Sequence, residues 1–428
     1  MSSPERQAAD PPQKHLLLLA STRGYEAKLY VEAAHKLGIP LRLGTDRCHR
    51  LDDPWADNAL PLRFEDPEAS ARLIVEEARR QPLQAIVPLG DRALRTAARA
   101  AQALGLPHHS PAAAEACRNK FVARQRLQAA GLRVPPFLRF SLRQDPRACL
   151  QEVPFPCVLK PLSLSASQGV IRADSPEEFL AAFARIQRLL QEPGMQVLRE
   201  ETSEWLLVEG FLPGREVVLE GLFDRGQLRV LALFDKPDPL DGPYFEETIL
   251  VTPSRLPGST QGEIIRTVKH AARALGLCHG PIHAELRLPP EGPRVLEVAA
   301  RSIGGLCSRA LRFRAGLSLP ELILRHAWGL PIDPVVREDA AAGVMMIPIP
   351  RAGVFQGVEG VEEARRVPGI EDIAITAKPA HPLRPLPEGS SYLGFIFARD
   401  SSPEKVEQAL REAHRRLRFR LAPRLPVA

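Results

Sequence analysis

Short apolar runs alternate with amphipathic stretches over the first hundred residues of the chain. The apolar runs have the length and composition of buried strands, and the stretches between them carry apolar residues at helical spacing. The predicted strands are residues 16–20, 41–43 and 85–89, and the predicted helices are residues 27–37, 69–80 and 92–104. Strands that alternate with helices form parallel sheets with helices on both faces, so we expect an α/β unit here.

The turn after the first predicted strand, residues 21–24, could offer backbone N–H groups at the start of a helix. It lacks the G-x-G-x-x-G pattern of a dinucleotide-binding turn. A dinucleotide site is therefore not supported.

The rest of the chain mixes strands and helices in a less regular order. Further strands are predicted at residues 157–161, 206–208, 216–223, 228–234, 282–288 and 294–300, and further helices at 121–130, 264–275, 320–328 and 403–417. These changes of pattern predict five segments: a disordered tail over residues 1–14, an α/β domain over 15–112, two further units over 113–205 and 206–333, and a small α+β appendage over 334–428.

Length and composition exclude several classes of protein. A chain of 428 residues is too long for one compact core. The longest early apolar run, residues 16–20, is too short for a secretory signal or for a membrane span of ~20 residues, so we expect a cytoplasmic protein without a membrane partner. The six cysteines contain no C-x-x-C pair, which predicts reduced thiols.

The net charge of +6 is modest for this length, and much of it comes from an arginine-rich stretch over residues 411–424. Only 5% of the residues are aromatic, so the basic stretch does not have the composition of a nucleic-acid-binding surface. We expect a solvated face there and no nucleic-acid partner.

Two acidic residues are predicted to face each other across a β-hairpin between residues 282 and 300. Alternate residues of a strand share a face, so Val295 and Glu297 should point to the same side of the second strand. A turn centred on Glu291 places Glu285 opposite Glu297, with Cβ atoms ~4.5–5.5 Å apart. Like charges at that separation repel unless a cation lies between them. Carboxylate oxygens completed by phosphate oxygens are ligands that Mg²⁺ accepts, which predicts a metal site.

The same acidic pair has a simpler explanation. Arg287 follows Glu285 on the same face of its strand and could neutralise both carboxylates as part of a surface ion network. From the spacing alone, the metal site and the ion network are about equally supported. A slip in strand register would also break the predicted geometry.

A lysine at the end of a predicted strand precedes a serine-rich loop. Lys160 is followed by Ser163, Ser165, Ser167 and Gly169. Backbone N–H groups and hydroxyls of such a loop can close over phosphates while the lysine supplies positive charge. The Walker A pattern is absent, and serine-rich turns are usually plain loops, so this motif alone is weak.

A third motif runs from Glu209 to Glu216, where a strand edge ends in a turn. The backbone groups of such an edge can pair with an adenine, and Glu216 could accept hydrogen bonds from ribose hydroxyls. Taken singly, the motif describes an ordinary exposed turn equally well.

Together these motifs resemble the ATP-grasp superfamily in their order and spacing. They are Asn119-Lys120, Lys160 with its serine loop, the segment from Glu209 to Glu216, and Glu285 and Glu297 with Arg301. Within that superfamily, residues 235–253, 297–305 and 342–418 resemble the branch that contains the bacterial L-amino acid ligases, or dipeptide synthetases. The resemblance covers residues ~15–420.

This resemblance implies a fold and an activity. The fold would comprise an N-terminal Rossmann-like domain, a two-part ATP-grasp domain with its smaller part over residues 113–205 and its larger part over 206–333, and a small C-terminal α+β subdomain. The activity would be that of a carboxylate–amine ligase that uses ATP and Mg²⁺, with Mn²⁺ as a substitute. Such an enzyme activates a carboxylate as an acyl phosphate, which an amine then attacks. Its partners would be small-molecule substrates, amino acids above all, and homodimers are common in the family.

The resemblance also implies roles for individual residues. Phosphate contacts would come from Lys120 and Lys160, with Ser165, Ser167 and Gly169 in the covering loop. The adenine would be lined by Glu209, Phe211 and Leu212, and the ribose held by Glu216. Magnesium would be bound by Glu285 and Glu297, and Arg301 would stabilise phosphoryl transfer. The amino-acid substrates would lie near Glu246, Glu247, His283, Ser302, Gly304 and Gly305.

One position departs from the family pattern. Many ATP-grasp enzymes carry E-x-N-x-R, in which the asparagine adds a metal contact, whereas this chain has Ala299 there. Either water or a bidentate Glu285 takes its place, or the metal binds less tightly. Two other functions therefore stay open: a carboxylase-type enzyme that activates bicarbonate, and an ATP-binding regulatory protein without catalysis.

The proton acceptor for the attacking amine is also open at this point. His283 and Glu246 are candidates, and His283 could equally serve only to orient Glu285.

Overall fold

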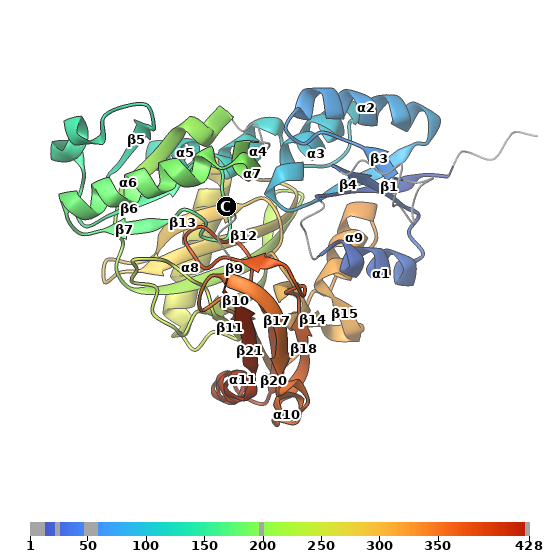
Figure 1. Ribbon diagram of the computed structural model, residues 1–428. Helices are drawn as coiled ribbons and strands as arrows, with labels where there is room; N and C mark the ends of the chain where they lie inside the picture. The colour runs from blue at the N-terminus through green and yellow to red at the C-terminus, as the bar shows by residue number, and fades with distance from the viewer. Residues whose placement is uncertain (1–12, 22–25, 47–58, 197–200, 424–428) are drawn as a thin grey trace, which may run out of the picture.

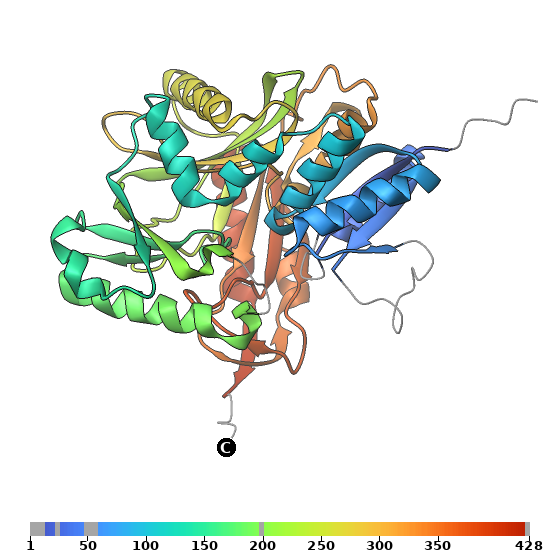
Figure 2. The same ribbon diagram turned by 90° about the horizontal axis from the view of Figure 1, so that it is seen from above.

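The computed structural model describes residues 13–21, 26–46, 59–196 and 201–423. Most of the predicted disordered tail and of the turn at residues 21–24 lies outside these ranges. Three units surround a common centre: an N-terminal unit, a smaller unit with the long helix α6, and a C-terminal unit (Figures 1 and 2).

The N-terminal unit contains a parallel sheet with strand order β3-β2-β1-β4. The strands are β1 (His15–Ala20), β2 (Leu41–Thr45), β3 (Ala59–Pro61) and β4 (Leu83–Leu89). Leu17 and Leu19 pack on the face covered by the helices α2 (Pro67–Arg80) and α3 (Asp91–Leu104).

Leu16 and Leu18 pack on the opposite face, against α1 (Ala27–Leu37) and α9 (Leu319–Trp328). The predicted parallel sheet with helices on both faces is therefore confirmed. One of its covering helices, α9, comes from a much later part of the chain, which ties the first unit to the rest of the molecule.

The smaller unit contains an antiparallel sheet with strand order β5-β8-β6-β7. The helix α6 (Pro176–Gln191) packs on this sheet and buries Phe179, Phe183 and Ile186. The strands are β5 (Phe137–Ser141), β6 (Cys157–Pro161), β7 (Ile171–Ala173) and β8 (Trp205–Gly210). The helices α4 (Pro111–Arg118) and α5 (Lys120–Ala129) precede the unit, and α7 (Pro193–Gln196) lies between α6 and β8. The division predicted between residues 205 and 206 stays a prediction. The pairing of β8 with β5 and β6 favours a division after Gly210.

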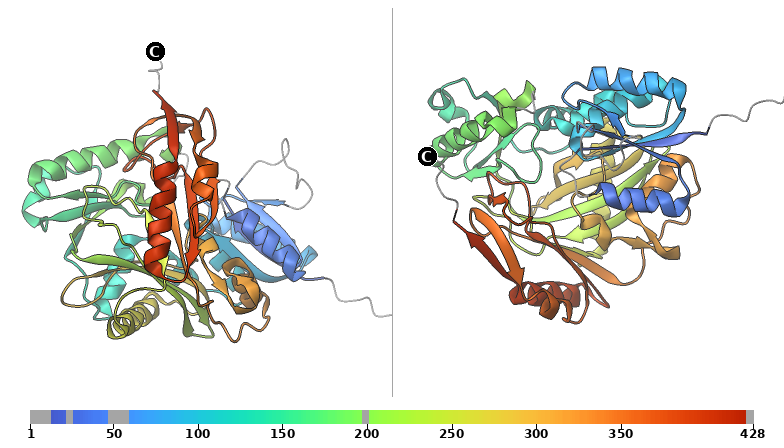
Figure 3. Two further views of the ribbon diagram at one scale, coloured as in Figure 1. Left: turned by 90° about the horizontal axis from the view of Figure 1, so that it is seen from below. Right: turned by 45° about the vertical axis from the view of Figure 1, so that its right-hand side comes forward.

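An eight-stranded antiparallel sheet runs through the rest of the molecule in the order β13-β12-β9-β10-β11-β16-β20-β18. Its first half consists of β9 (Arg215–Asp224), β10 (Gln227–Asp235), β11 (Ile249–Thr252), β12 (Gly280–Leu288) and β13 (Arg294–Ala299), covered by α8 (Gly258–Leu275). Its second half consists of β16 (Ala341–Ile347), β18 (Ile370–Ile375) and β20 (Gly394–Asp400), covered by α11 (Pro403–Arg416) (Figure 3).

β11 pairs directly with β16, so the sheet is continuous across the division predicted at residue 334. Backbone hydrogen bonds thus join the C-terminal part of the chain to the strands predicted as a separate unit over residues 206–333. Its remaining elements are β17 (Gly353–Glu359), α10 (Val361–Arg365), β19 (Pro382–Leu383) and β21 (Arg418–Ala422), and the short strands β14 (Arg312–Phe313) and β15 (Leu317–Ser318) precede α9. Among the described residues, no helix combines the length and the apolar character needed to cross a bilayer.

Candidate active site

A cavity of about 480 Å³ lies where the three units meet. The N-terminal unit contributes Glu26 and Asp91 to its wall, and the C-terminal part contributes Tyr392 and Phe395. Most of the charged residues that the sequence analysis singled out also line this cavity: Lys120, Lys160, Glu209, Glu216, Glu247, His283, Glu285, Glu297 and Arg301.

The hairpin of β12 and β13 brings the two predicted carboxylates together. Glu285 is the cross-strand partner of Glu297, as predicted. The register then shifts, so that Leu286 pairs with Val295 and Leu296 forms a β-bulge. The prediction that Val295 shares the face of Glu297 is therefore wrong, because Val295 packs into the core while Leu296 and Glu297 both line the cavity.

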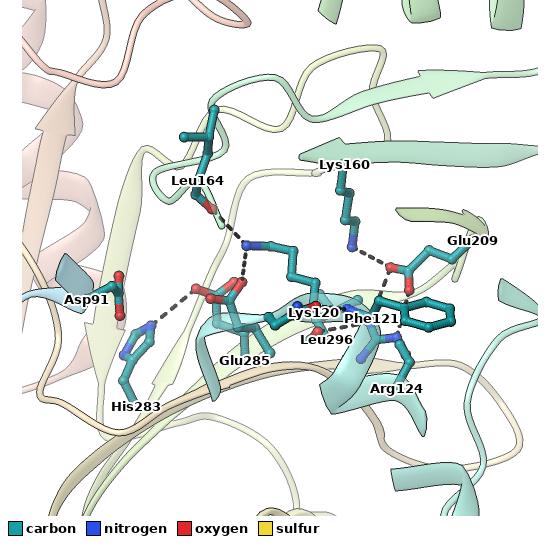
Figure 4. Close-up of polar contacts among 12 residues, drawn as sticks. Asp91, Lys120, Phe121, Arg124, Lys160, Leu164, Glu209, His283, Glu285 and Leu296 are labelled. Atoms are coloured by element: carbon teal, nitrogen blue, oxygen red, sulfur yellow. Dashed lines mark hydrogen bonds and ion pairs between the residues drawn. The ribbon is translucent and has the colours of Figure 1, made fainter. Parts of the chain in front are cut away.

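Arg287 does not neutralise this pair. Its side chain is buried and its Nε lies 3.1 Å from Glu216 Oε2, while its other nitrogens donate to the carbonyl oxygens of Gly214 and Leu240. A cation near Glu297 is Lys120, whose Nζ lies 3.5 Å from Glu297 Oε2. The same ammonium group donates to the carbonyl oxygen of Leu164 over 2.7 Å (Figure 4). The surface ion network proposed as the simpler explanation is not what the structure contains.

Lys236 is a second cation at the carboxylates, and the sequence analysis missed its role. Its buried ammonium group donates to Glu216 and Glu247 and lies 3.3 Å from Glu285 Oε2. Burial of this ammonium would lower its pKa, but the three carboxylates raise the pKa well above its usual range. Oxygen atoms of Glu216, Glu247 and Glu285 lie within 4.8 Å of one another, which is a donor set suited to a divalent cation.

His283 is held between two carboxylates. Its Nδ1 contacts Glu220 and its Nε2 lies 3.1 Å from Glu285 Oε1 (Figure 4). Burial would lower the pKa of His283, but Glu220 and Glu285 raise it to about 10. Both ring nitrogens are therefore engaged, and the imidazole orients Glu285.

Arg301 is fixed by a bidentate ion pair that crosses between units. Its Nε and one terminal nitrogen lie 2.9 and 3.0 Å from the two carboxylate oxygens of Asp91, at the start of α3. The other terminal nitrogen donates to the carbonyl oxygen of Ser302 over 3.0 Å. Bidentate pairing of this kind fixes the plane of the guanidinium as well as its position.

At the opposite end of the cavity, Glu209 is buried between Arg124 and Lys160. Arg124 contacts both of its oxygens, at 2.6 and 3.2 Å, and the Lys160 ammonium contacts one of them (Figure 4). Burial would raise the pKa of Glu209, but Arg124 and Lys160 lower it to about 2. Arg124 also donates to the carbonyl oxygen of the bulged residue Leu296 over 2.8 Å, so the bulge and this ion pair support each other.

The serine loop after Lys160 lines the cavity and is joined to the C-terminal part of the chain. Gly169 has φ of +73°, and a Cβ there would lie 2.7 Å from Pro161 Cγ, so only glycine fits. Its N–H donates to the carbonyl oxygen of Pro387 over 2.8 Å, and Gln168 donates to the carbonyl oxygen of Glu388 over 2.8 Å.

The same C-terminal segment also holds the helices of the smaller unit. Arg185 pairs with both oxygens of Glu388, and Arg384 with both oxygens of Glu192. We call residues 384–390 the strap.

Models of three families match consecutive parts of the chain. They describe an ATP-grasp N-terminal domain over residues 31–108, an ATP-grasp domain over 153–310 and the L-amino acid ligase C-terminal domain 2 over 345–422. A D-alanine–D-alanine ligase from Geotalea uraniireducens is 30% identical over 57% of this chain and 72% of its own length. The chain belongs to the ATP-grasp family.

Two further matches lie closer to the L-amino acid ligase branch. The crystal structure of an L-amino acid ligase from Bacillus licheniformis superposes with a TM-score of 0.81 and 28% identity, covering 96% of this chain and 99% of that one. An alanine–anticapsin ligase from Bacillus subtilis is 28% identical over 53% of this chain, and the matching region spans 50% of the length of that ligase. The ATP-grasp fold and the resemblance to this branch are confirmed.

The cavity is lined by most, but not all, of the residues predicted for the substrate and nucleotide sites. Phe211 lines it, and its N–H donates to the carbonyl oxygen of Pro156, so this amide already has a partner. Ser302 bonds to Tyr30 over 3.2 Å and lies behind the cavity wall. Glu247 lines the cavity and its neighbour Glu246 does not. Gly304, Gly305, Ser165, Ser167 and Leu212 all line it.

Several residues of the site were missed because their partners are remote in sequence. Asp91 lines the cavity, and Arg124, Glu220 and Lys236 contact the lining residues Glu209, His283 and Glu285, respectively. None of the four has a motif of its own. Lys236 lies in the segment 235–253 that resembles the L-amino acid ligases, which was the one signal that could have identified it.

Proposed function

We propose that this chain is an L-amino acid ligase, which uses ATP to join the carboxyl group of one amino acid to the amino group of another. The observation that supports this most directly is the convergence of Glu285, Glu297, Lys120 and Arg301 on one cavity. Phosphoryl transfer depends mostly on positioning and on neutralising the charge of phosphate oxygens, which is what these residue types provide.

In the first step, the γ-phosphoryl group of ATP is transferred to the substrate carboxylate. Lys120 and Lys160 contact the phosphates, with Ser165 and Ser167 in the covering loop. Arg301 stabilises the transferring group and the resulting acyl phosphate, and Asp91 keeps its guanidinium in place. Exclusion of water by the loop protects the acyl phosphate until an amine attacks.

The nucleotide occupies the end of the cavity near β8. Glu209, Phe211 and Leu212 line the adenine. Glu216, whose carboxylate also contacts Lys236 at the border of the reaction end, lies toward the ribose. Gly169 keeps the loop close to Pro161, where a larger residue would not fit.

The donor atoms in the cavity fit a divalent cation. Glu285 and Glu297 would hold Mg²⁺, for which Mn²⁺ could substitute, and Glu216 and Glu247 offer further carboxylate oxygens near Glu285. When bound, the ion would supply positive charge that stabilises phosphoryl transfer. Ala299 offers no side-chain ligand, so the side-chain ligands from this hairpin would be the two carboxylates.

The amino-acid substrates bind between Gly304-Gly305 and the C-terminal part of the chain. The wall there includes apolar side chains from three strands: Val218 of β9, Leu250 of β11 and Met346 of β16. Phe395 of β20 extends this wall. Such a wall favours an amino acid with an apolar side chain.

Two other functions are less well supported. A bicarbonate-activating enzyme would have no use for the C-terminal domain that matches the L-amino acid ligases over residues 345–422. A regulatory protein without catalysis would not need Glu285, Glu297, Lys120 and Arg301 in one cavity.

The test is a phosphate-release screen with ATP, Mg²⁺ and pairs of amino acids, followed by mass measurement of the products. We expect release that depends on both amino acids and a product whose mass is that of the pair minus water. Release that bicarbonate stimulates and amino acids do not would contradict the proposal. ATP binding without release in any mixture would also contradict it.

A further inference from the structure

An attacking amine must lose a proton, and neither candidate from the sequence analysis is placed to accept it. Both ring nitrogens of His283 already contact carboxylates. Glu246 lies outside the cavity lining. The acceptor must be another group on the cavity wall, close to the place where the acyl phosphate forms.

Glu26 meets both conditions. It precedes the first turn of α1, lines the cavity and is partly exposed to it. Its carboxylate accepts a hydrogen bond from the backbone N–H of Gly305. Its Oε1 lies 3.7 Å from the position that a Cβ of Gly304 would occupy, so it lies directly beside the Gly304-Gly305 turn.

The charges around Glu26 leave it available as a base. Within the described part of the chain, Arg301 is the cation that acts on the Glu26 carboxylate, and that guanidinium is committed to Asp91 and to the carbonyl oxygen of Ser302. Asp91, Glu220 and the buried Tyr30 also face it. Burial raises the pKa of Glu26, Arg301 lowers it and Asp91 raises it again, with a result of about 7. A base is most effective when its pKa lies near the working pH.

We infer that Glu26 is the general base that takes a proton from the attacking ammonium group in the amide-forming step. The inference rests on the proposed function. The ammonium gives one proton to the Glu26 carboxylate, and the freed electron pair of nitrogen forms the C–N bond. The C–O bond to phosphate breaks, its electron pair leaves with the phosphate beside Arg301, and the second nitrogen proton goes to that phosphate. Glu26 then releases its proton to solvent.

The experiment compares Glu26→Gln with the wild type in two reactions of the full chain. One reaction is amide formation with an amino acid. The other is trapping of the acyl phosphate by hydroxylamine, a nucleophile that is already neutral at neutral pH. Glu32→Gln is the matched control, because Glu32 lies exposed on α1, the helix that Glu26 directly precedes. Glu26→Asp tests whether a displaced carboxylate restores part of the rate.

We expect Glu26→Gln to slow amide formation by ~10²–10⁴-fold, while hydroxamate formation stays within a few-fold of wild type. The wild-type rate of amide formation should rise with pH through about 7, and this rise should be lost in the variant. Glu26→Asp should recover part of the amide rate.

Three outcomes would overturn the inference. The first is an unchanged rate of amide formation in Glu26→Gln, and the second is an equal loss of amide and hydroxamate with a raised KM for the acid substrate. The third is a Glu26→Gln protein that no longer melts cooperatively, together with an equally inactive Glu26→Asp. If the wild type itself forms neither hydroxamate nor amide with any amino acid, the proposed function fails instead.

Discussion

The two ends of the cavity differ in how their charges are balanced. At the nucleotide end, one carboxylate, Glu209, is held by two cations, Arg124 and Lys160. At the reaction end, the ammonium of Lys236 is shared by Glu216, Glu247 and Glu285. Arg287 also pairs with Glu216, and His283 lies between Glu285 and Glu220, so four carboxylates face three cationic groups. The first arrangement is complete within the protein. The second keeps an excess of negative charge, which is stable only where further cations arrive with a ligand.

This contrast separates two kinds of ion cluster in one site. A cluster whose carboxylate is fully paired by cations of the protein positions Lys160 whether or not ligand is bound. A cluster with an excess of negative charge can bind further cations and release them again. Removing single charges from each end should therefore have different consequences.

The largest effect is expected for Lys236→Met. The variant leaves Glu216, Glu247 and Glu285 together without their shared ammonium, and breaking a buried ion cluster in this way costs ~3–5 kcal/mol of folding free energy. Mg²⁺ should recover part of this loss by binding the freed carboxylates. Thermal melts with and without Mg²⁺ measure both effects.

Lys28→Met is the control for Lys236→Met, because the Lys28 side chain is 84% exposed in its pair with Glu32. Its melting curve should match the wild type. If Lys236→Met melts like the wild type and gains nothing from Mg²⁺, the description of the reaction end is wrong.

The next largest effect is expected for Glu297→Gln. It removes one negative charge opposite Glu285 with little change in volume, and loss of one charged group at a phosphoryl-transfer site typically costs 10²–10³-fold in rate. Phosphate release and a melting curve should show lost turnover in a folded protein. Glu291→Gln, in the exposed turn of the same hairpin, should retain turnover. A normal rate of phosphate release in Glu297→Gln would contradict the assignment of Glu297 as a metal ligand.

Glu209 should make the protein sensitive to acid. Its folded-state pKa of about 2 lies below the ordinary value of 4.5 for a glutamate, so its stabilising contribution is present above pH ~4.5 and is lost as the pH falls toward 2. A shift of this size corresponds to about 3 kcal/mol. Denaturant unfolding of Glu209→Gln between pH 5 and 2 should therefore depend less on pH than unfolding of the wild type. Parallel curves for the two proteins would contradict the charge balance described for the nucleotide end.

The smallest effect is expected at the strap. Arg384 pairs with Glu192 near the surface, with both side chains more than a third exposed, so Arg384→Ala should cost less than about 1 kcal/mol. Its consequence should appear locally, as faster proteolytic cleavage within residues 163–170 and a few-fold weaker ATP binding. Arg366→Ala, at an exposed position on the C-terminal part, provides the comparison. Equal cleavage of the two variants would mean that the strap does not hold the loop.

Much of the fold was predictable because it is encoded locally. The boundaries of α1 match the apolar spacing, and Gly38 in the left-handed conformation ends the helix. Two helices, α4 and α6, were missed although each begins with the same signal, a serine followed by proline. Ser110 and Ser175 accept hydrogen bonds from the backbone of the first turn, and these caps could have been recognised.

The site was predictable only where a strand's own periodicity fixes it. Glu285 and Glu297 belong to one hairpin, so the turn sets their register. The bulge at Leu296 was not predictable, because it depends on Arg124 from another unit. The pairs Arg301–Asp91 and Arg124–Glu209 join residues far apart in sequence, and no local pattern contains them.

The unbroken run of strands from β13 to β18 determines which part of the molecule can move. A movement of the C-terminal part away from the rest would break the hydrogen bonds between β11 and β16, whereas the smaller unit contributes no strand to this sheet. A displacement of the smaller unit would therefore leave the long sheet intact. It would break the hydrogen bond from the N–H of Gly169 to the carbonyl oxygen of Pro387, so the strength of that contact would affect how readily the serine loop opens.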